Sequence, residues 1–248
     1  MAMTLAAFDT LASRYDELWT RSAVGRSQRA AVWHRVDSLF GSGDSVLDLG
    51  CGTGEDALHL VAAGVRVHAF DKSKDMVRVA LERGVNANVL PIEQIGDVMG
   101  TYDGVLSNFG ALNCVSDLSS LRQPLARLVR RGGHLAICLI GSFCPWETIW
   151  YLIQGRPRKA VRRWTGRSFS PSLGIEVHYP SVKSVVDAFR PDFELRSWQG
   201  IGLFVPPSYV GGASKAVVGR LDRIDRRVCH LPLLRAAADH RLFIFVRR

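Results

Sequence analysis

The amino-acid sequence predicts an α/β fold in which helices cover both faces of a mostly parallel sheet. Between residues 45 and 140, short apolar stretches of strand character alternate with helical stretches, an order typical of parallel sheets. The stretch VLDLGCGTGEDALHLVAAGVRVHAFD, residues 46–71, shows this best, since strand, glycine-rich turn, helix and acid-ended strand follow one another. The chain has 248 residues, enough to bury a core without disulfides or metal ions.

The helices and strands are predicted from local patterns. Apolar residues at helical spacing, such as Val32, Val36 and Leu39, indicate helices, and Ser181 is a plausible helix cap. Helices are expected over residues 5–19, 26–40, 55–64, 73–84, 118–132, 181–189 and 214–228. Short apolar runs bounded by glycine or polar residues indicate strands. Strands are expected over residues 45–50, 65–71, 87–90, 102–109, 132–141, 193–205 and 240–248.

The alternation stops between residues 143 and 174. The sequence there predicts an amphipathic helix, broken at Gly155 and Pro157 and followed by a polar loop. We interpret residues 143–174 as a helical insertion that lies over the carboxyl edge of the sheet. The whole chain, residues 1–248, is expected to form a single domain.

Composition limits the classes of protein to which the chain can belong. Its five cysteines are widely spaced and contain no C-x-x-C pair, which argues against a disulfide framework or a metal site. The chain has no apolar run long enough for a membrane span, and its start lacks the basic region of a secretory signal. We therefore expect a cytoplasmic protein.

Positive charge is concentrated in one segment of a chain whose formal net charge is +9. Residues 155–167 contain no acid and six basic residues, namely Arg156, Arg158, Lys159, Arg162, Arg163 and Arg167. Such a segment can attract nucleic acid, an anionic membrane surface or an acidic substrate, but most often it is a solvated helix face.

The glycine-rich turn at Gly50, Gly52 and Gly54 offers backbone N–H groups to a ligand. A dinucleotide-binding turn would carry its third glycine where Glu55 stands, and the carboxylates of Glu55 and Asp56 would disfavour a pyrophosphate. At the end of the next strand, Asp71 can accept hydrogen bonds from ribose hydroxyls. A ribose ligand with positive charge and no phosphate is S-adenosylmethionine.

The stretch VLDLGCGTGEDALHLVAAGVRVHAFDKSKDMVRVA, residues 46–80, resembles the first two motifs of the class I S-adenosylmethionine-dependent methyltransferases. The resemblance spans roughly residues 8–140 and implies a Rossmann-like, seven-stranded sheet flanked by helices. It also implies S-adenosylmethionine as the methyl donor and S-adenosylhomocysteine as the product. Tyr15 matches the YD motif of the ubiquinone-biosynthesis-like small-molecule branch, in which helices of residues 1–40 would cover the cofactor.

The resemblance also implies a set of cofactor contacts. The loop of residues 50–54 would hold the methionyl part, Asp71 would bind the ribose, and Ile92 would pack on the adenine. Many members have an acid that accepts a hydrogen bond from the adenine amino group at the position of Pro91. The Pro91 side chain has no acceptor for that hydrogen bond. The full implied set is Tyr15, Asp48, Gly50, Cys51, Gly52, Thr53, Gly54, Asp71, Lys72, Ile92, Glu93, Ser107, Asn108 and Phe109.

The acceptor is less constrained by the sequence. Methyl transfer is an in-line displacement that needs no dedicated base, but His178 and Tyr179 are candidate catalytic residues at the end of the insertion. Residues 107–114, SNFGALNC, lack the [DN]-P-P-[FYW] motif of many nucleic-acid methyltransferases, which argues against a nucleic-acid substrate. The insertion supplies Trp146, Trp150 and other apolar residues, which suit an apolar pocket.

We therefore expect a small-molecule acceptor of aromatic, quinone-like or natural-product type. Three alternatives stay open. They are an RNA or protein methyltransferase that uses residues 155–167, a non-catalytic methyltransferase-like scaffold, and a dinucleotide oxidoreductase. The oligomeric state and the methylated atom are not predicted.

Overall fold

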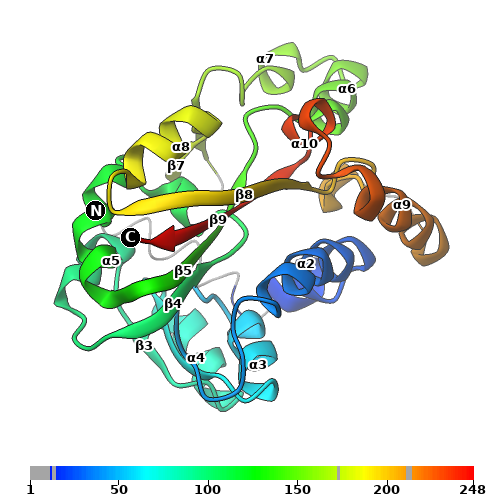
Figure 1. Ribbon diagram of the computed structural model, residues 1–248. Helices are drawn as coiled ribbons and strands as arrows, with labels where there is room; N and C mark the ends of the chain where they lie inside the picture. The colour runs from blue at the N-terminus through cyan, green and yellow to red at the C-terminus, as the bar shows by residue number, and fades with distance from the viewer. Residues whose placement is uncertain (1–11, 13–14, 172–173, 211–213) are drawn as a thin grey trace.

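The computed structural model describes residue 12 and residues 15–171, 174–210 and 214–248. Figure 1 shows a twisted sheet whose strands run in the order β3-β2-β1-β4-β5-β9-β8. The strands are β1 (Ser45–Leu49), β2 (Arg66–Asp71), β3 (Ala87–Val89), β4 (Tyr102–Ser107), β5 (Val129–Ile140), β8 (Phe193–Ile201) and β9 (His240–Arg247). The predicted seven-stranded, mostly parallel α/β fold is confirmed.

One strand is antiparallel to its neighbours. β1 pairs in parallel with β2 and β4, and β4 pairs in parallel with β5. β9 runs antiparallel between β5 and β8, with Ile140 opposite His240 on one side and Ile201 opposite His240 on the other. The first residue of β9 therefore lies at the same edge as the carboxyl ends of the parallel strands.

Successive residues of the strands face two separate hydrophobic cores. Val46 of β1 packs with Val36 and Leu60 in one core, which lies against α2 (Ala23–Val36), α3 (Glu55–Ala62) and α4 (Lys74–Glu82). Leu47 packs with Leu125 in the other core, which lies against α5 (Arg122–Leu128) and α8 (Val182–Phe189). Burial of both faces is the reason that these strands are nearly continuous runs of apolar residues.

The insertion differs in part from the prediction. Its helical part forms α6 (Pro145–Ile153) and α7 (Pro157–Ala160), separated near Gly155 and Pro157 as expected. The predicted polar loop is instead a hairpin of β6 (Arg167–Ser170) and β7 (Ile175–His178). Phe169 and Val177 lie within these strands, and their alternation with polar residues is too short to indicate strands clearly by pattern alone.

Other differences concern the ends of elements. The expected helix over 118–132 is a short 3-10 turn, η4 (Leu118–Leu121), followed by α5, and β5 begins already at Val129. Val129 pairs with Tyr102, and the register then shifts before Gly104 pairs with His134. This irregularity in the pairing lies at the start of β5, before its apolar part. The remaining elements are η1 (Asp16–Thr20), η2 (Ile92–Asp97), η3 (Ala111–Cys114), η5 (Ser208–Val210), α9 (Lys215–Val228) and α10 (Pro232–Ala236).

The expected first helix over 5–19 falls largely outside the described residues, and its described part, η1, is a π-helical turn. Within the described part of the chain, no helix combines the length and apolar character that a membrane span requires.

Candidate functional site

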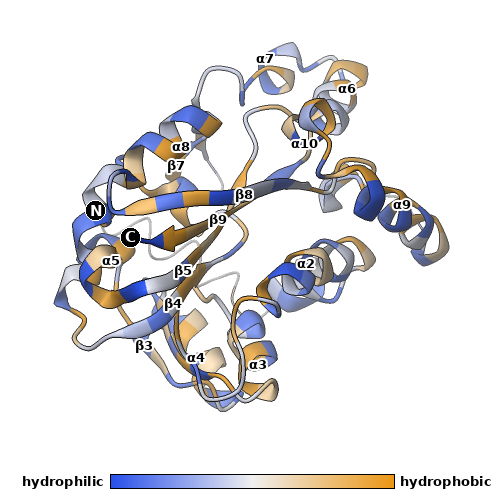
Figure 2. Cartoon of the chain, viewed as in Figure 1, coloured by the Kyte–Doolittle hydropathy of each residue, from blue (hydrophilic) through white to orange (hydrophobic). Residues whose placement is uncertain are grey.

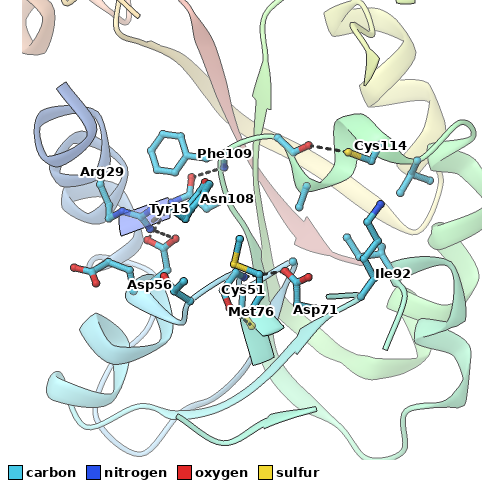
Figure 3. Close-up of a pocket in the computed structure, with 18 of the residues that line it drawn as sticks. Tyr15, Arg29, Cys51, Asp56, Asp71, Met76, Ile92, Asn108, Phe109 and Cys114 are labelled. Carbon is cyan, nitrogen blue, oxygen red and sulfur yellow. Dashed lines mark hydrogen bonds and ion pairs between the residues drawn. The ribbon is translucent and has the colours of Figure 1, made fainter. Parts of the chain in front are cut away.

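A cavity opens at the carboxyl ends of β1, β2 and β4, and Figure 3 shows the side chains around it. Arg29 and Asp56 lie on one side of the view, Ile92 on the other, and Cys51 and Asp71 between them. The lining residues are Tyr15, Arg29, Gly50, Cys51, Gly52, Thr53, Glu55, Asp56, Asp71, Lys72, Met76, Ile92, Glu93, Asn108, Phe109, Gly110, Ala111, Cys114 and Val115.

The glycine-rich turn after β1 forms the floor of the cavity. The backbone N–H groups of Gly50 and Cys51 donate to the carbonyl of Phe70, at 2.7 and 3.0 Å, and so hold the turn against β2. Gly50 has a φ of +73°, and a Cβ atom there would lie 2.2 Å from the Cβ of Ala111. A larger residue would therefore fill the floor or displace the η3 turn.

Asp71 ends β2 and lies at the centre of the cavity. Its Oδ2 accepts a hydrogen bond from the N–H of Gly52 at 2.9 Å, and its Oδ1 accepts one from the N–H of Ser73 at 2.9 Å. Burial raises the pKa of Asp71, and the backbone N–H groups of Ser73, Gly52 and Lys72 oppose that shift. A carboxylate has about four lone-pair sites, so Asp71 can still accept a hydrogen bond from a ligand hydroxyl.

Three residues of the implied cofactor set support the cavity without lining it. Asp48 is buried in β1, and its Oδ2 has no hydrogen-bond partner in the described part of the structure. Burial and the nearby charge of Asp56 raise the pKa of Asp48 well above its ordinary value. The hydroxyl of Ser107 donates to the carbonyl of Leu49 at 2.8 Å, and Gly54 begins α3 with a left-handed backbone.

Asp56 joins three elements of the structure at one carboxylate. Trp33 Nε1 of α2 donates to its Oδ1 at 2.7 Å, and Asn108 Nδ2 after β4 donates to the same atom at 3.1 Å. Arg29 of α2 forms a buried ion pair with its Oδ2. The Arg29 guanidinium also lies over the rings of Trp19 and Phe109, 4.8 and 5.2 Å from their centroids.

The other carboxylate at the start of α3 is also neutralised. Glu55 forms an ion pair with Arg83, and Arg83 also contacts Asp16 of η1 at 3.3 Å. From sequence alone, Glu55 and Asp56 are expected to repel a pyrophosphate, on the assumption that both carboxylates lack a neighbouring cation. Because each forms an ion pair, the repulsion of a pyrophosphate is weaker than expected. The absence of the third glycine at residue 55 still argues against a dinucleotide.

The described turn η1 lies against the glycine-rich turn. The hydroxyl of Thr53 donates to Oδ1 of Asp16 at 2.7 Å, which fastens η1 to the turn. Tyr15, just before η1, lines the cavity, and burial raises the pKa of its hydroxyl. The tyrosine of the YD motif is therefore placed where a cover for a ligand would lie.

Aromatic side chains gather where β4 ends. Phe109 has a φ of +47°, unusual for a residue other than glycine, and its N–H donates to Oδ1 of Asn108 at 3.0 Å. The Phe109 ring contacts Trp19 edge-to-face at 4.5 Å and His240 at 5.2 Å between centroids. Backbone strain of this kind often occurs at ligand sites.

The two predicted catalytic residues do not line the cavity. The Tyr179 hydroxyl lies 2.9 Å from Oγ of Ser168, and His178 Nε2 lies 3.6 Å from Glu176. Both residues belong to the hairpin side of the insertion, where the carbonyl of His178 also accepts a hydrogen bond from Asn113. Their catalytic role stays a prediction without a contact to the cavity.

The structure brings eleven of the fourteen implied cofactor residues to the cavity wall, and it adds eight that the implied set did not contain, of which only Glu55 and Asp56 had been expected near the ligand. The additions are Arg29, Glu55, Asp56, Met76, Gly110, Ala111, Cys114 and Val115. Gly110, Ala111, Cys114 and Val115 follow the carboxyl end of the strand predicted over residues 102–109. Their position after that strand was the signal in the sequence that could have identified them. Arg29 lies far upstream of the glycine-rich turn and carried no signal in the sequence.

The chain is similar in sequence to known methyltransferases. A protein-family profile described as "Methyltransferase domain" matches residues 46–133. A demethylmenaquinone methyltransferase from Thermobifida fusca is 34% identical over 174 residues, which cover 66% of this chain and 72% of that relative. Another, from Mycobacterium sp. strain JLS, is 30% identical over 160 residues, covering 62% and 68%.

Solved structures agree in fold at low identity. An S-adenosylmethionine-dependent methyltransferase from Mesorhizobium loti is 17% identical, with a TM-score of 0.60 and coverage of 88% of this chain and 98% of that one. The [4+2]-cyclase SpnF is 15% identical, with a TM-score of 0.56 and coverage of 89% and 80%. The same fold thus occurs in proteins named for different reactions, and the fold alone does not give the acceptor.

Proposed function

The chain belongs to the class I S-adenosylmethionine-dependent methyltransferases, and we propose that its acceptor is a lipophilic, aromatic or quinone-like small molecule. The observation that carries the proposal is the similarity to two relatives named demethylmenaquinone methyltransferase. The aromatic side chains around Phe109, at the end of the cavity formed by β4, support an aromatic acceptor.

The residues around the cavity fit S-adenosylmethionine. Asp71 lines the cavity and can accept a hydrogen bond from a ribose hydroxyl, and the lack of a side chain at Gly50 lets a ligand approach the backbone of the turn closely. Ile92 and Val115 form an apolar wall for the adenine, and Glu93 follows Ile92. The Oδ2 of Asp48, unpartnered among the described residues, would carry negative charge once a cationic methionyl group is bound, because a nearby cation lowers the pKa that burial raises. The cofactor, when bound, supplies an activated methyl group.

The protein contributes position and exclusion of water to such a reaction. Tyr15 and η1 would cover the cofactor, because Thr53 and Arg83 hold Asp16 against the glycine-rich turn. Asn108, fixed by Asp56, orients the end of β4 and so the Phe109 ring. In this proposal the acceptor lies beside Phe109, facing the methyl donor.

A phenol or carbon acid acceptor benefits from a nearby base. His240 begins β9, packs on Phe109, and its Nδ1 lies 3.3 Å from Oδ2 of Asp239 without the geometry of a hydrogen bond. We propose His240 as the proton acceptor, in preference to His178 and Tyr179, since the edge-to-face contact with Phe109 brings it next to the cavity wall.

A labelled-methyl assay tests the proposed function. The purified chain is incubated with S-adenosylmethionine carrying a labelled methyl group and, separately, with a short-chain demethylnaphthoquinol, simple phenols, RNA and a protein extract. Label in the quinol or the phenols alone is the expected result. Label in RNA or protein would overturn the small-molecule assignment in favour of the macromolecular alternative.

A thermal-shift series with S-adenosylhomocysteine, NAD and NADP checks the cofactor independently. A ligand at about a hundred times its dissociation constant adds about 2.7 kcal/mol, or roughly 5 to 10 °C for a chain of this size. We expect the shift with S-adenosylhomocysteine alone. A shift with NAD or NADP would revive the dinucleotide alternative.

We further propose a cytoplasmic location, which the odd number of widely spaced cysteines supports. The RNA alternative has less support than the small-molecule one. Two of the six basic residues between 155 and 167, Arg162 and Arg163, form ion pairs with Glu147 within the protein.

A further inference from the structure

Helix α6 of the insertion places its charge inside and its apolar side chains outside. Glu147 is only 1% exposed, whereas Ile149, Leu152 and Ile153 are 54%, 54% and 77% exposed. The spacing of these three residues puts them on one face of the helix, called here the apolar face of α6. A soluble helix ordinarily shows the opposite arrangement.

A buried ionic cluster fixes this orientation. The carboxylate of Glu147 accepts hydrogen bonds from Arg162 Nε at 2.7 Å and Arg163 Nη2 at 2.7 Å, and from the hydroxyl of Tyr209. Arg163 also pairs with Asp239 at 2.9 Å, next to the first residue of β9. The apolar face cannot turn inward without burying an unpaired charge, which is strongly unfavourable.

Positive charge lies directly after the apolar face. Arg156, Arg158 and Lys159, called here the basic segment of α7, are all exposed, and residues 155–167 contain no acid. In Figures 1 and 2, α6 and α7 lie together at the top of the molecule, and both carry hydrophobic and hydrophilic colour. The pair thus combines an exposed apolar surface with excess positive charge.

We propose that α6 and α7 dock on the surface of an anionic lipid bilayer. Ile149, Leu152 and Ile153 would enter the boundary between headgroups and acyl chains, and the basic segment would contact lipid phosphates. Charge complementarity selects an anionic surface, and the exposed isoleucine and leucine side chains select lipid over RNA, whose bases stack on aromatic rings or arginine.

Docking on a bilayer is a property beyond the proposed function. Only the reason for docking, access to a lipophilic acceptor, rests on the proposed function. Arg163 joins α6 to Asp239, next to the first residue of β9 at the carboxyl edge of the sheet, so docking would bring that edge towards the phase in which a lipophilic quinone dissolves. The binding itself requires no acceptor, and it can therefore be tested separately.

Co-sedimentation of the full chain with vesicles tests the docking. One set contains phosphatidylcholine alone and the other contains phosphatidylcholine with phosphatidylglycerol. We expect binding to the anionic vesicles and much weaker binding to the neutral ones. Replacing Arg156, Arg158 and Lys159 by Gln should weaken binding about fivefold for each charge removed. Replacing Ile149, Leu152 and Ile153 by Ser should weaken it by about tenfold or more.

Two matched controls lie at the opposite edge of the sheet. Met99→Ser removes a side chain that is 76% exposed, and Arg131→Gln removes an exposed charge. Both should bind vesicles as the unmodified chain does. Melting temperature and S-adenosylhomocysteine binding, measured on every variant, show that the fold and the cofactor site are intact.

Several results would overturn the docking. The unmodified chain could fail to sediment with anionic vesicles, or both triple variants could bind as well as it does. If the serine variant converted an oligomer to a monomer without changing vesicle binding, the apolar face would join two copies of the chain. If RNA bound and only the charge variant lost it, the basic segment would serve RNA. Failure in the labelled-methyl assay would leave the vesicle result unaffected.

Discussion

Arg29 and Asp56 form a buried ion pair that connects helix α2 to the first turn of α3, and both residues line the cavity. Because Asp56 also accepts hydrogen bonds from Trp33 and Asn108, one carboxylate connects α2, the start of α3 and the end of β4. The shape of the cavity therefore depends on a contact between residues 27 positions apart in the sequence.

Replacing Arg29 by Met should destabilise the protein by about 3 to 5 kcal/mol, since Asp56 would stay buried without its cation. Urea denaturation measures the loss. The matched control is Arg78→Met, which removes an exposed ion pair with Glu82, and a change within about 0.5 kcal/mol is expected there. Equal losses in the two variants would mean that the Arg29 pair contributes no more than a surface pair.

Asp71→Ala should weaken binding of S-adenosylhomocysteine by about 1 to 3 kcal/mol, because charge-assisted hydrogen bonds to the ribose would be lost. Part of this effect comes from the turn itself, since the N–H groups of Gly52 and Ser73 would lose their acceptor. Titration calorimetry gives the affinity. Asp75→Ala, nearby on the exposed side of α4, should bind as the unmodified chain does. An unchanged affinity in Asp71→Ala would show that the ribose lies elsewhere.

The turn and its acid could be predicted because their role is local. Gly50 and Asp71 belong to one continuous βαβ unit, so the order of residues alone brings them together. Arg29 and His240 reach the same region by packing of elements that are distant in the sequence. Single side chains on ordinary helices and strands give no pattern that separates them from surface or core residues.

The insertion shows the same limit. Its helical character and its break at Gly155 followed from composition, but the inward direction of Glu147 did not. That direction is set by Arg163 and Asp239, and Asp239 directly precedes β9, whose place in the sheet comes from its antiparallel pairing with β5 and β8. The basic residues of 155–167 looked alike in sequence, yet two of them form this buried cluster.

Asp48→Asn should raise the stability of the cofactor-free protein by about 1 to 3 kcal/mol at neutral pH, because a neutral amide replaces a carboxyl group whose ionisation is opposed by burial. Burial raises the pKa of Asp48, so its protonated form favours folding. That contribution is complete below about pH 4 and is lost as pH rises through the raised pKa. Melting temperatures across this range should converge for the two proteins at low pH.

The same substitution should weaken S-adenosylhomocysteine binding if Asp48 supplies charge to the methionyl group. A stability gain with unchanged affinity would restrict Asp48 to a structural role. A loss of stability at neutral pH would contradict the burial of an uncompensated carboxylate.

Glu147→Gln should destabilise the protein by about 3 kcal/mol at pH 7, since Arg162 and Arg163 would lose their shared carboxylate. Burial alone would raise the pKa of Glu147, but the two arginines lower it overall. Its contribution is therefore present above about pH 4 and disappears as pH falls through the lowered pKa. Denaturation curves for the two proteins should approach each other in acid. Glu176→Gln, an exposed partner of Arg167, serves as the control and should change little.

His240→Ala should lower the rate of methyl transfer at saturating substrates by about a hundredfold, within the range for loss of a general base. S-adenosylhomocysteine affinity should stay unchanged, because His240 packs on Phe109 and does not itself line the cavity. Added imidazole should restore part of the rate, an effect that a purely structural histidine would not show. His178→Ala is the matched control, and its rate should be near that of the unmodified enzyme because His178 does not line the cavity and its ring nitrogen lies near Glu176. A rate loss in His178→Ala and none in His240→Ala would return the role of base to the insertion.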